Sequence, residues 1–271
     1  MNAKPVLLGI SMLGLIGCST LPSVNAETPQ TPPANSILSP RIGPIHLLGH
    51  AKATTGPVLI SMYGDSTMQG WTKETGVGTL SPRNVPAELQ AFLTAGGYSA
   101  TVTNLGTFGT TTGNLLNGTN GVPRSWIAEM TSSTAQIVVI NEGLNDALAI
   151  YNGTETSAQF MSNWNQLITI AQQQGKQVYI ETPNPRTDIP LKYVQEVEEL
   201  EYFVDVQLNY SAGFIDQYAA ITQRLPNWKS HLPDGIHPDD TMYAFKATND
   251  LVGIVPTTFN LNPATAPSSL P

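Results

Sequence analysis

Four short polar motifs contain the residue types of nucleophilic ester chemistry, and they are well separated along the chain. A serine hydroxyl is a poor nucleophile unless a base takes its proton. His237 can be that base, and Asp234 in the same motif can orient and stabilise the imidazole. The candidate nucleophile is Ser66. The motifs are GDST (64–67), NLGTFGTT (104–111), GLND (143–146) and DGIH (234–237).

The same chemistry requires rigid hydrogen-bond donors for the oxyanion that develops on the substrate. The backbone N–H of Ser66, the N–H of a glycine in the second motif and the side-chain amide of Asn145 are candidate donors. Glycine suits such a position because its backbone can approach a substrate closely. Gly106 and Gly109 both meet this requirement.

These residues also have ordinary structural interpretations. Ser66 alone would be a turn or capping residue, and Asp65 is expected to hold the turn by accepting backbone N–H bonds. Asn145 and Asp146 can cap a helix. The presence of serine, histidine, aspartate and asparagine motifs together favours catalysis. Trp71, shortly after Ser66, is the tryptophan best placed to line the site.

A metal site is a further possibility at the histidine motif, but the sequence does not favour it. No second histidine or carboxylate motif supports it, and two of the candidate ligands suit the start of the last helix. We therefore predict neither a metal nor an organic cofactor. The candidate ligands are Asp234, His237, Asp239 and Asp240.

Strands and helices alternate between the motifs, which predicts a parallel sheet with helices on both faces. In such sheets functional residues gather at the carboxyl ends of the strands, where three of the motifs begin. Strands are expected at 58–63, 98–105, 135–141, 177–181 and 212–216, and helices at 85–95, 156–174, 191–207 and 239–252.

Composition narrows the class of protein. The chain has 271 residues, a hydrophobic content of 41% and a charged content of only 12%. With 12 Lys and Arg residues and a net charge of −8 it has no basic run to neutralise phosphates, so we expect no nucleic-acid partner. Because Cys18 is the only cysteine, an intramolecular disulfide is excluded.

The N-terminus resembles a secretion signal, with a lysine before an apolar run too short to span a bilayer. Residues 1–18 end in Leu-Ile-Gly-Cys, which resembles a lipobox with Cys18 as the lipidated residue. Cleavage after Ala26 is the alternative. Both predict export, to the cell envelope by a lipid anchor or to the periplasm or medium. Residues 19–56 are a Pro/Ser/Thr-rich linker, and 256–271 an irregular tail.

The four motifs occur in the order and approximate spacing of the SGNH (GDSL-type) hydrolases, which the sequence resembles over residues 58–253. The resemblance implies a three-layer α/β/α sandwich over 57–255, with a mostly parallel, flavodoxin-like sheet of five strands. It also implies serine-dependent ester hydrolysis. By motif, Ser66 is the nucleophile, Asp234 and His237 complete the triad, and Asn145 and a glycine donate to the oxyanion. The family usually has an asparagine just after the second strand. If Asn104 is matched to it, the resemblance implies that Gly109 is the glycine that donates to the oxyanion.

One departure concerns the residues after the serine, where Thr67-Met68 replace the family's frequent Leu-Ser and alter the wall beside the nucleophile. We expect the substrate to be a small-molecule or polysaccharide ester carrying a small acyl group such as acetyl. A lipase or lysophospholipase acting on longer acyl chains, and a glycan-binding lipoprotein without activity, are the alternatives. The sequence leaves the oligomeric state open.

Overall fold

The computed structural model of the chain describes residues 57–207 and 212–258. The predicted signal peptide, Cys18, the linker at 19–56 and residues 259–271 of the predicted tail lie outside the described residues.

Five strands form one sheet in the order β4-β1-β5-β6-β7, and every neighbouring pair is parallel. All five were predicted from the sequence, and their ends shift by at most two residues. The strands are β1 (Val58–Gly64), β4 (Ala100–Gly106), β5 (Ile137–Asn141), β6 (Gln177–Glu181) and β7 (Gly213–Ile215).

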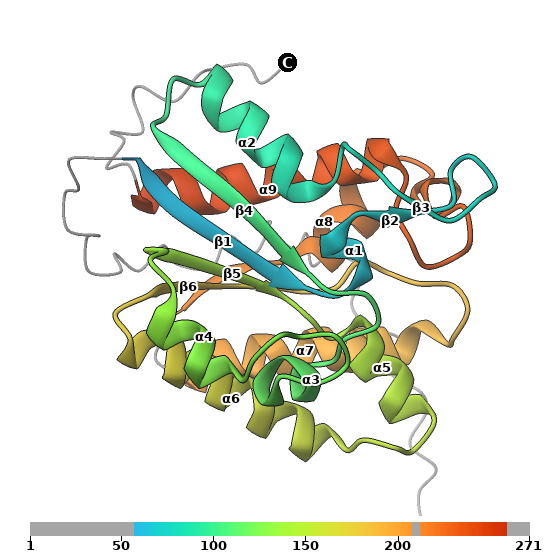
Figure 1. The fold of residues 1–271 in the computed structure, drawn as a ribbon. Coiled ribbons are helices and arrows are strands. Elements are labelled where there is room, and N and C mark those ends of the chain that lie inside the picture. Colours follow the sequence, from blue (N-terminus) through green and yellow to red (C-terminus); the bar gives the residue numbers. More distant parts are fainter. Residues whose placement is uncertain (1–56, 208–211, 259–271) are drawn as a thin grey trace, which may run out of the picture. The chain divides into compact units, whose positions relative to one another are not determined.

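Helices cover both faces of this sheet, so the predicted three-layer α/β/α sandwich is confirmed (Figure 1). One face carries α2 (Val85–Ala95) and α9 (Asp240–Thr258), and the other carries α4 (Trp126–Ser132), α6 (Ser157–Gln173) and α7 (Leu191–Gln207). Within the described ranges, no helix combines the length and the apolar character needed to cross a bilayer.

The two central strands supply both cores because successive side chains of a strand point to opposite faces. Ile137 and Val139 of β5 pack towards α2 and α9, whereas Val138 and Ile140 pack against the α4, α6 and α7 layer. All four are fully buried. A strand that is apolar on both faces can only be central, which agrees with the position of β5 between β1 and β6.

Several short elements were missed by the sequence analysis, because one or two helical turns give too few residues to show a period. Helix α9 also continues past the predicted end at Val252 to Thr258. The short elements that bear on the site follow the ends of β1, β4 and β5. They are α1 (Ser66–Gln69), the hairpin strands β2 (Trp71–Thr72) and β3 (Thr79–Leu80), α3 (Thr112–Asn117) and α5 (Leu144–Tyr151).

Candidate active site

Ser66 stands where β1 turns sharply into α1. Gly64 ends the strand so close to β5 that a Cβ there would lie 2.4 Å from the carbonyl oxygen of Asn141. Asp65 then caps α1, and its Oδ1 accepts hydrogen bonds from the Thr67 amide at 2.7 Å and the Thr67 hydroxyl at 2.8 Å. The structural role predicted for Asp65 agrees with these bonds. The turn fixes Ser66, which is 4% exposed, as the first residue of the helix.

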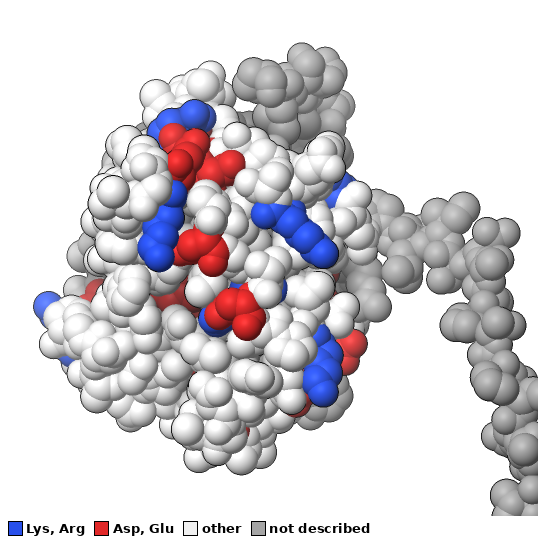
Figure 2. All heavy atoms as spheres, turned by 90° about the vertical axis from the view of Figure 1, so that its right-hand side faces the viewer, with Lys and Arg blue, Asp and Glu red and all other residues white. Residues whose placement is uncertain are grey.

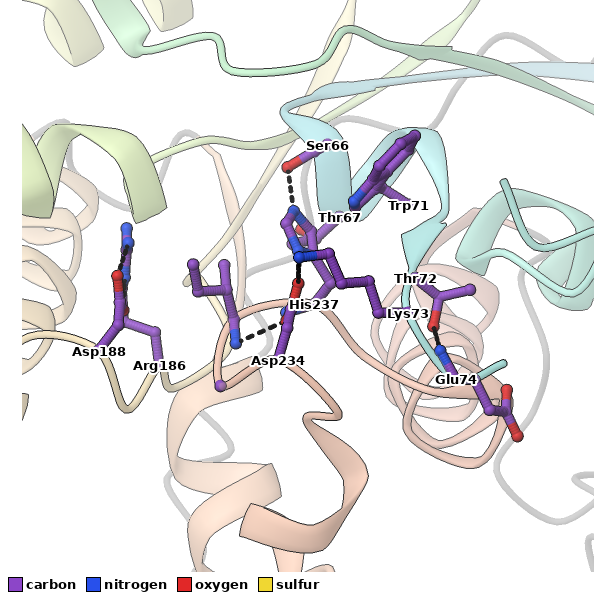
Figure 3. Close-up of polar contacts among 12 residues, drawn as sticks. Ser66, Thr67, Trp71, Thr72, Lys73, Glu74, Arg186, Asp188, Asp234 and His237 are labelled. Carbon is purple, nitrogen blue, oxygen red and sulfur yellow. Dashed lines mark hydrogen bonds and ion pairs between the residues drawn. The ribbon is translucent and has the colours of Figure 1, made fainter. Parts of the chain in front are cut away.

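His237 and Asp234 lie beside this serine although they come from the other end of the chain (Figure 3). Oγ of Ser66 is 3.0 Å from Nε2 of His237, and Nδ1 of the same ring is 2.8 Å from Oδ2 of Asp234. The imidazole is therefore held between a hydroxyl and a carboxylate. This arrangement can move a proton from the hydroxyl to the ring while the carboxylate stabilises the imidazolium.

Asp234 is held in its ionised form by its own loop. Its Oδ1 accepts hydrogen bonds from the backbone amides of Ile236 at 3.1 Å and His237 at 2.8 Å. Partial burial would raise the pKa of Asp234, but the hydrogen bonds from the backbone and ring of His237 and from Ile236 outweigh it and lower the pKa below its usual value. Lys73 adds a half-exposed ammonium, with Nζ 3.9 Å from Oδ2.

The loop that follows β6 braces the histidine loop. The Thr187 amide donates to the carbonyl of Gly235 at 2.7 Å, and the Asn184 side chain donates to the carbonyl of Ile236 at 3.1 Å. Gly235 has a φ of +81°, a conformation that favours glycine, and this lets the loop turn tightly between Asp234 and His237. The geometry of the histidine loop thus depends on a segment about fifty residues earlier in the chain.

The two candidate oxyanion glycines have different surroundings. The Gly106 amide already donates to Oδ1 of Asn104 at 2.9 Å, and a Cβ at Gly106 would lie 2.3 Å from the backbone nitrogen of Gln69. Gly106 therefore packs β4 against α1. Gly109 lies beyond the end of β4 in the following loop, with a φ of +72° and space around its Cα.

Asn145 lies in the first turn of α5, and its Nδ2 donates to the carbonyl of Thr110 at 2.7 Å. This bond ties Asn145 to the loop that contains Gly109, and the amide has a second hydrogen for another acceptor. The neighbouring Asp146 caps a different helix, because its carboxylate accepts the amide and hydroxyl of Thr112 at the start of α3. The loops after β4 and β5 are thus joined.

Arg186 is a residue of this site that the sequence analysis missed. Its side chain is 3% exposed, pairs with Asp188 through two hydrogen bonds at 2.6 and 2.5 Å, and donates from Nη1 to the carbonyl of Leu144 at 2.8 Å. It therefore connects the loop after β6 to the residue preceding Asn145. The sequence contained an indication of its role, because Arg186 lies in the loop after a predicted strand, and three of the polar motifs also follow strand ends.

Two aromatic side chains stand beside the imidazole. The ring centroids of Trp71 and Phe108 each lie 6.3 Å from that of His237, and 5.4 Å from each other. The position of Trp71 agrees with the prediction that it lines the site. Phe108 was missed, although it immediately precedes Gly109 in the second motif.

Charged side chains of both signs lie near one another on the face of the molecule at the carboxyl ends of the strands (Figure 2). Figure 2 shows lysine, arginine, aspartate and glutamate side chains in small separate groups on a surface that is mostly uncharged. The low content of charged residues, 12% of the chain, is consistent with this view.

Comparison with known proteins agrees with the fold and the motifs. The model of the GDSL-like lipase/acylhydrolase family matches residues 62–245, which is more than half of the chain. The matched region includes Ser66, Asn145, Asp234 and His237. No curated protein sequence gives a significant match.

Several solved structures share the fold at low sequence identity. Axe2, an acetylxylan esterase from Geobacillus stearothermophilus, is 18% identical with a TM-score of 0.54, covering 73% of this chain and 94% of its own. Est24, a carbohydrate acetylesterase from Sinorhizobium meliloti, is 16% identical with a TM-score of 0.55, covering 72% and 98%. TesA is 20% identical with a TM-score of 0.58, covering 73% and 99%. From the extent of the family match and the fold, the chain belongs to the GDSL-like lipase/acylhydrolase family of serine ester hydrolases.

Proposed function

We propose that the chain is an exported esterase that removes a small acyl group, such as acetyl, from a carbohydrate. The observation that carries the catalytic part of this proposal is the hydrogen-bonded series from Ser66 Oγ to His237 Nε2 at 3.0 Å and from His237 Nδ1 to Asp234 Oδ2 at 2.8 Å. In this arrangement an alcohol can be deprotonated as it attacks a carbonyl carbon.

The proposed reaction has two halves. Ser66 Oγ attacks the ester carbonyl while His237 takes its proton, and the tetrahedral intermediate then expels the alcohol, which receives that proton from His237. The product of this half is an acyl-enzyme. A water molecule then attacks the acyl carbon while His237 takes its proton. The bond between the acyl carbon and Ser66 Oγ breaks, Oγ receives the proton back from His237, and the carboxylic acid leaves.

The proposed oxyanion donors are the backbone amides of Ser66 and Gly109 and the side-chain amide of Asn145. The space around Gly109 supports this set, and the bond from Nδ2 of Asn145 to the carbonyl of Thr110 ties Asn145 to the loop that contains Gly109. The Gly106 amide is already paired with Asn104, which favours Gly109 over Gly106. Each donor of this kind is worth about 3 kcal/mol of transition-state stabilisation.

Two kinds of observation support the substrate proposal. Two proteins with the same fold are named as an acetylxylan esterase and a carbohydrate acetylesterase. The face that carries the site is mostly uncharged, which suits a neutral polyhydroxylated substrate better than an anionic one (Figure 2). Export is proposed from the N-terminal sequence, with its apolar run and Cys18.

A substrate comparison tests this function. Purified protein lacking residues 1–26 would be assayed for acetate release from acetylated xylan and for hydrolysis of p-nitrophenyl acetate, butyrate and octanoate. We expect acetate release from the polysaccharide and the highest kcat/KM for the acetate ester, with Ser66→Ala inactive on all substrates. A preference for octanoate with no release from xylan would replace the proposal with the lipase-type alternative.

A further inference from the structure

Exposed apolar side chains lie on the hairpin and on the loop after β4, and one aromatic ring from each of these segments stands beside the catalytic histidine. Phe108 in the loop after β4 is 54% exposed, and Leu80 and Val77 of the hairpin are 50% and 72% exposed. Trp71, which begins the hairpin, pairs with Leu80 and contacts Phe108 edge-to-face with centroids 5.4 Å apart. Exposed aromatic side chains next to a reacting centre are suited to ligand contact.

The hairpin that carries part of this surface is firmly attached to the rest of the site. The hydroxyl of Tyr243 donates to the carbonyl of Trp71 at 2.5 Å, and Oγ of Ser81 donates to the carboxylate of Asp240 at 2.5 Å. The backbone at Gly78 passes so near the indole that a Cβ there would lie 2.3 Å from Cζ2 of Trp71. The hairpin backbone is therefore attached to α9, and Gly78 packs against the indole, which lies beside His237.

The position of the rings relative to the imidazole indicates which part of the ester they meet. The leaving oxygen must come within about 3 Å of Nε2 of His237 to receive its proton. The ring centroids of Trp71 and Phe108 lie 6.3 Å from that of the imidazole, so a group attached to that oxygen is within reach of them.

The other side of the imidazole is chemically different. Figure 3 shows the paired Arg186 and Asp188 on one side of His237 and Trp71 on the other. The Trp71 side also carries the half-exposed ammonium of Lys73 near Asp234, so it combines the rings of Trp71 and Phe108 with one charged group (Figure 3). We place the leaving alcohol on this side because it is the one that offers aromatic ring faces beside the imidazole.

We infer that Trp71 and Phe108 bind the alcohol part of the ester by stacking against a ring, and that the alcohol of the substrate is cyclic. Aromatic faces carry partial negative charge, and the C–H groups on one face of a saturated ring carry partial positive charge. A pyranose offers such a face and keeps its hydroxyl groups in water. The inference deepens the proposed function and rests on it for the identity of the ring as a sugar.

The test compares acetate esters that differ only in the alcohol. Trp71→Ala, Trp71→Phe and Phe108→Ala would be assayed on cyclohexyl acetate and ethyl acetate in the full chain. We expect the ratio of kcat/KM for the cyclic ester over the acyclic ester to fall about tenfold in both alanine variants, mainly through KM. Trp71→Phe should keep most of the preference, because it retains a ring, and it covers the case in which Trp71→Ala fails to fold.

The matched control is Ile127→Ala, an exposed apolar side chain (47% exposed) on α4, away from the hairpin and the loop after β4. It should leave the ratio unchanged. If kcat/KM falls equally for cyclohexyl acetate and ethyl acetate in the Trp71 and Phe108 variants, the inference is overturned, because the rings would then only position His237. A second outcome would also overturn the inference. If the Trp71 and Phe108 variants keep the preference for the cyclic ester but change the ratio of kcat/KM for p-nitrophenyl octanoate over p-nitrophenyl acetate, the surface binds the acyl chain.

A third substrate separates this inference from the proposed function. Methyl tri-O-acetyl-xyloside presents a sugar ring with acetyl esters. If the wild type does not deacetylate it but the variants still lose the preference for cyclohexyl acetate, the inference stands and the carbohydrate proposal fails. If the wild type deacetylates it and the variants retain both activities, the inference is overturned and the proposed function stands.

Discussion

Nε2 of His237 lies 3.0 Å from Oγ of Ser66, across 171 positions of sequence. The serine is fixed by the turn at the end of β1, and the histidine by a loop that α9, the hairpin and the loop after β6 hold in place. This contact joins the helix that follows β1 to the loop that precedes α9. The catalytic predictions below depend on it.

Replacing Ser66 by alanine should abolish turnover and leave the fold intact. The hydroxyl is the proposed nucleophile, and removing one atom from a 4%-exposed site leaves little space to fill. We expect kcat for p-nitrophenyl acetate to fall by about ten-thousandfold or more, and labelling by a fluorophosphonate to disappear, with an unchanged circular dichroism spectrum. Persistent labelling of the variant would identify a different nucleophile.

Asn145→Ala should lower kcat by about a hundredfold or more, with little change in KM, if its amide stabilises the oxyanion. Asn117→Ala is the matched control, because this exposed asparagine donates only a local bond to the carbonyl of Gly113 within α3. An unaltered rate in the Asn145 variant would remove the residue from the oxyanion hole. Its role would then be limited to its bond with Thr110.

Arg186→Met should slow catalysis indirectly, by releasing the carbonyl of Leu144 next to Asn145. We expect kcat to fall about tenfold, because a small displacement of a catalytic donor has a large effect on rate. Arg186→Lys should not restore the rate, since an ammonium cannot bridge Asp188 and Leu144 as the planar guanidinium does.

The control for Arg186 is Arg124→Met, which removes an exposed arginine paired with Glu129. It should leave kcat unchanged. Because breaking a buried ion pair is also destabilising, rates would be measured well below the unfolding temperature of each variant. If Arg186→Met lowers the free energy of unfolding but keeps the kcat of the wild type, Arg186 supports the fold and not the position of Asn145.

Asp146 should make the protein less stable as the pH rises. Burial raises the pKa of this carboxyl to about 6, although hydrogen bonds from Thr112 partly offset the shift. The folded state therefore binds the proton more tightly than the unfolded state does, where the value is near 4. The free energy of unfolding should fall as the pH increases from about 4 to about 6, by about 1.4 kcal/mol for each unit of pKa difference.

Asp146→Asn tests this directly, because Oδ1 of asparagine can still accept from Thr112 and the side chain no longer ionises. The stability of the variant relative to the wild type should increase across this pH range, measured by urea denaturation. Glu199→Gln on the exposed surface of α7 controls for net charge. A stability difference between Asp146→Asn and wild type that does not vary with pH would contradict the assigned shift.

Cys18→Ser addresses localisation. If Cys18 is lipidated, the wild type should fractionate with membranes and the variant should not, since the lipid is the proposed anchor. N-terminal sequencing of the mature protein provides the second measurement. If the mature protein begins after Ala26, and both the wild type and Cys18→Ser stay out of the membrane fraction, the N-terminus is removed by ordinary signal cleavage.

The layers of the fold and the positions of the four motifs at strand ends could be predicted from the amino-acid pattern alone. Apolar, β-branched runs such as 137–141 can be buried only as central strands, and the polar motifs begin where these runs end. That information is local, so it can be read from neighbouring residues: Asp65 caps its own helix, and Asp234 binds the amide of His237 in its own loop.

How these local segments come together depends on contacts between residues far apart in the chain. The short helices and the hairpin have too few residues for a pattern, and their positions depend on contacts such as Tyr243 with Trp71. The difference between Gly106 and Gly109 also appears only in three dimensions, because α1 crowds the first and leaves the second open. Arg186 and Phe108 follow predicted strand ends, but the contacts that bring them to the site, such as the bond from Arg186 to the carbonyl of Leu144, come from distant parts of the chain and appear only in three dimensions.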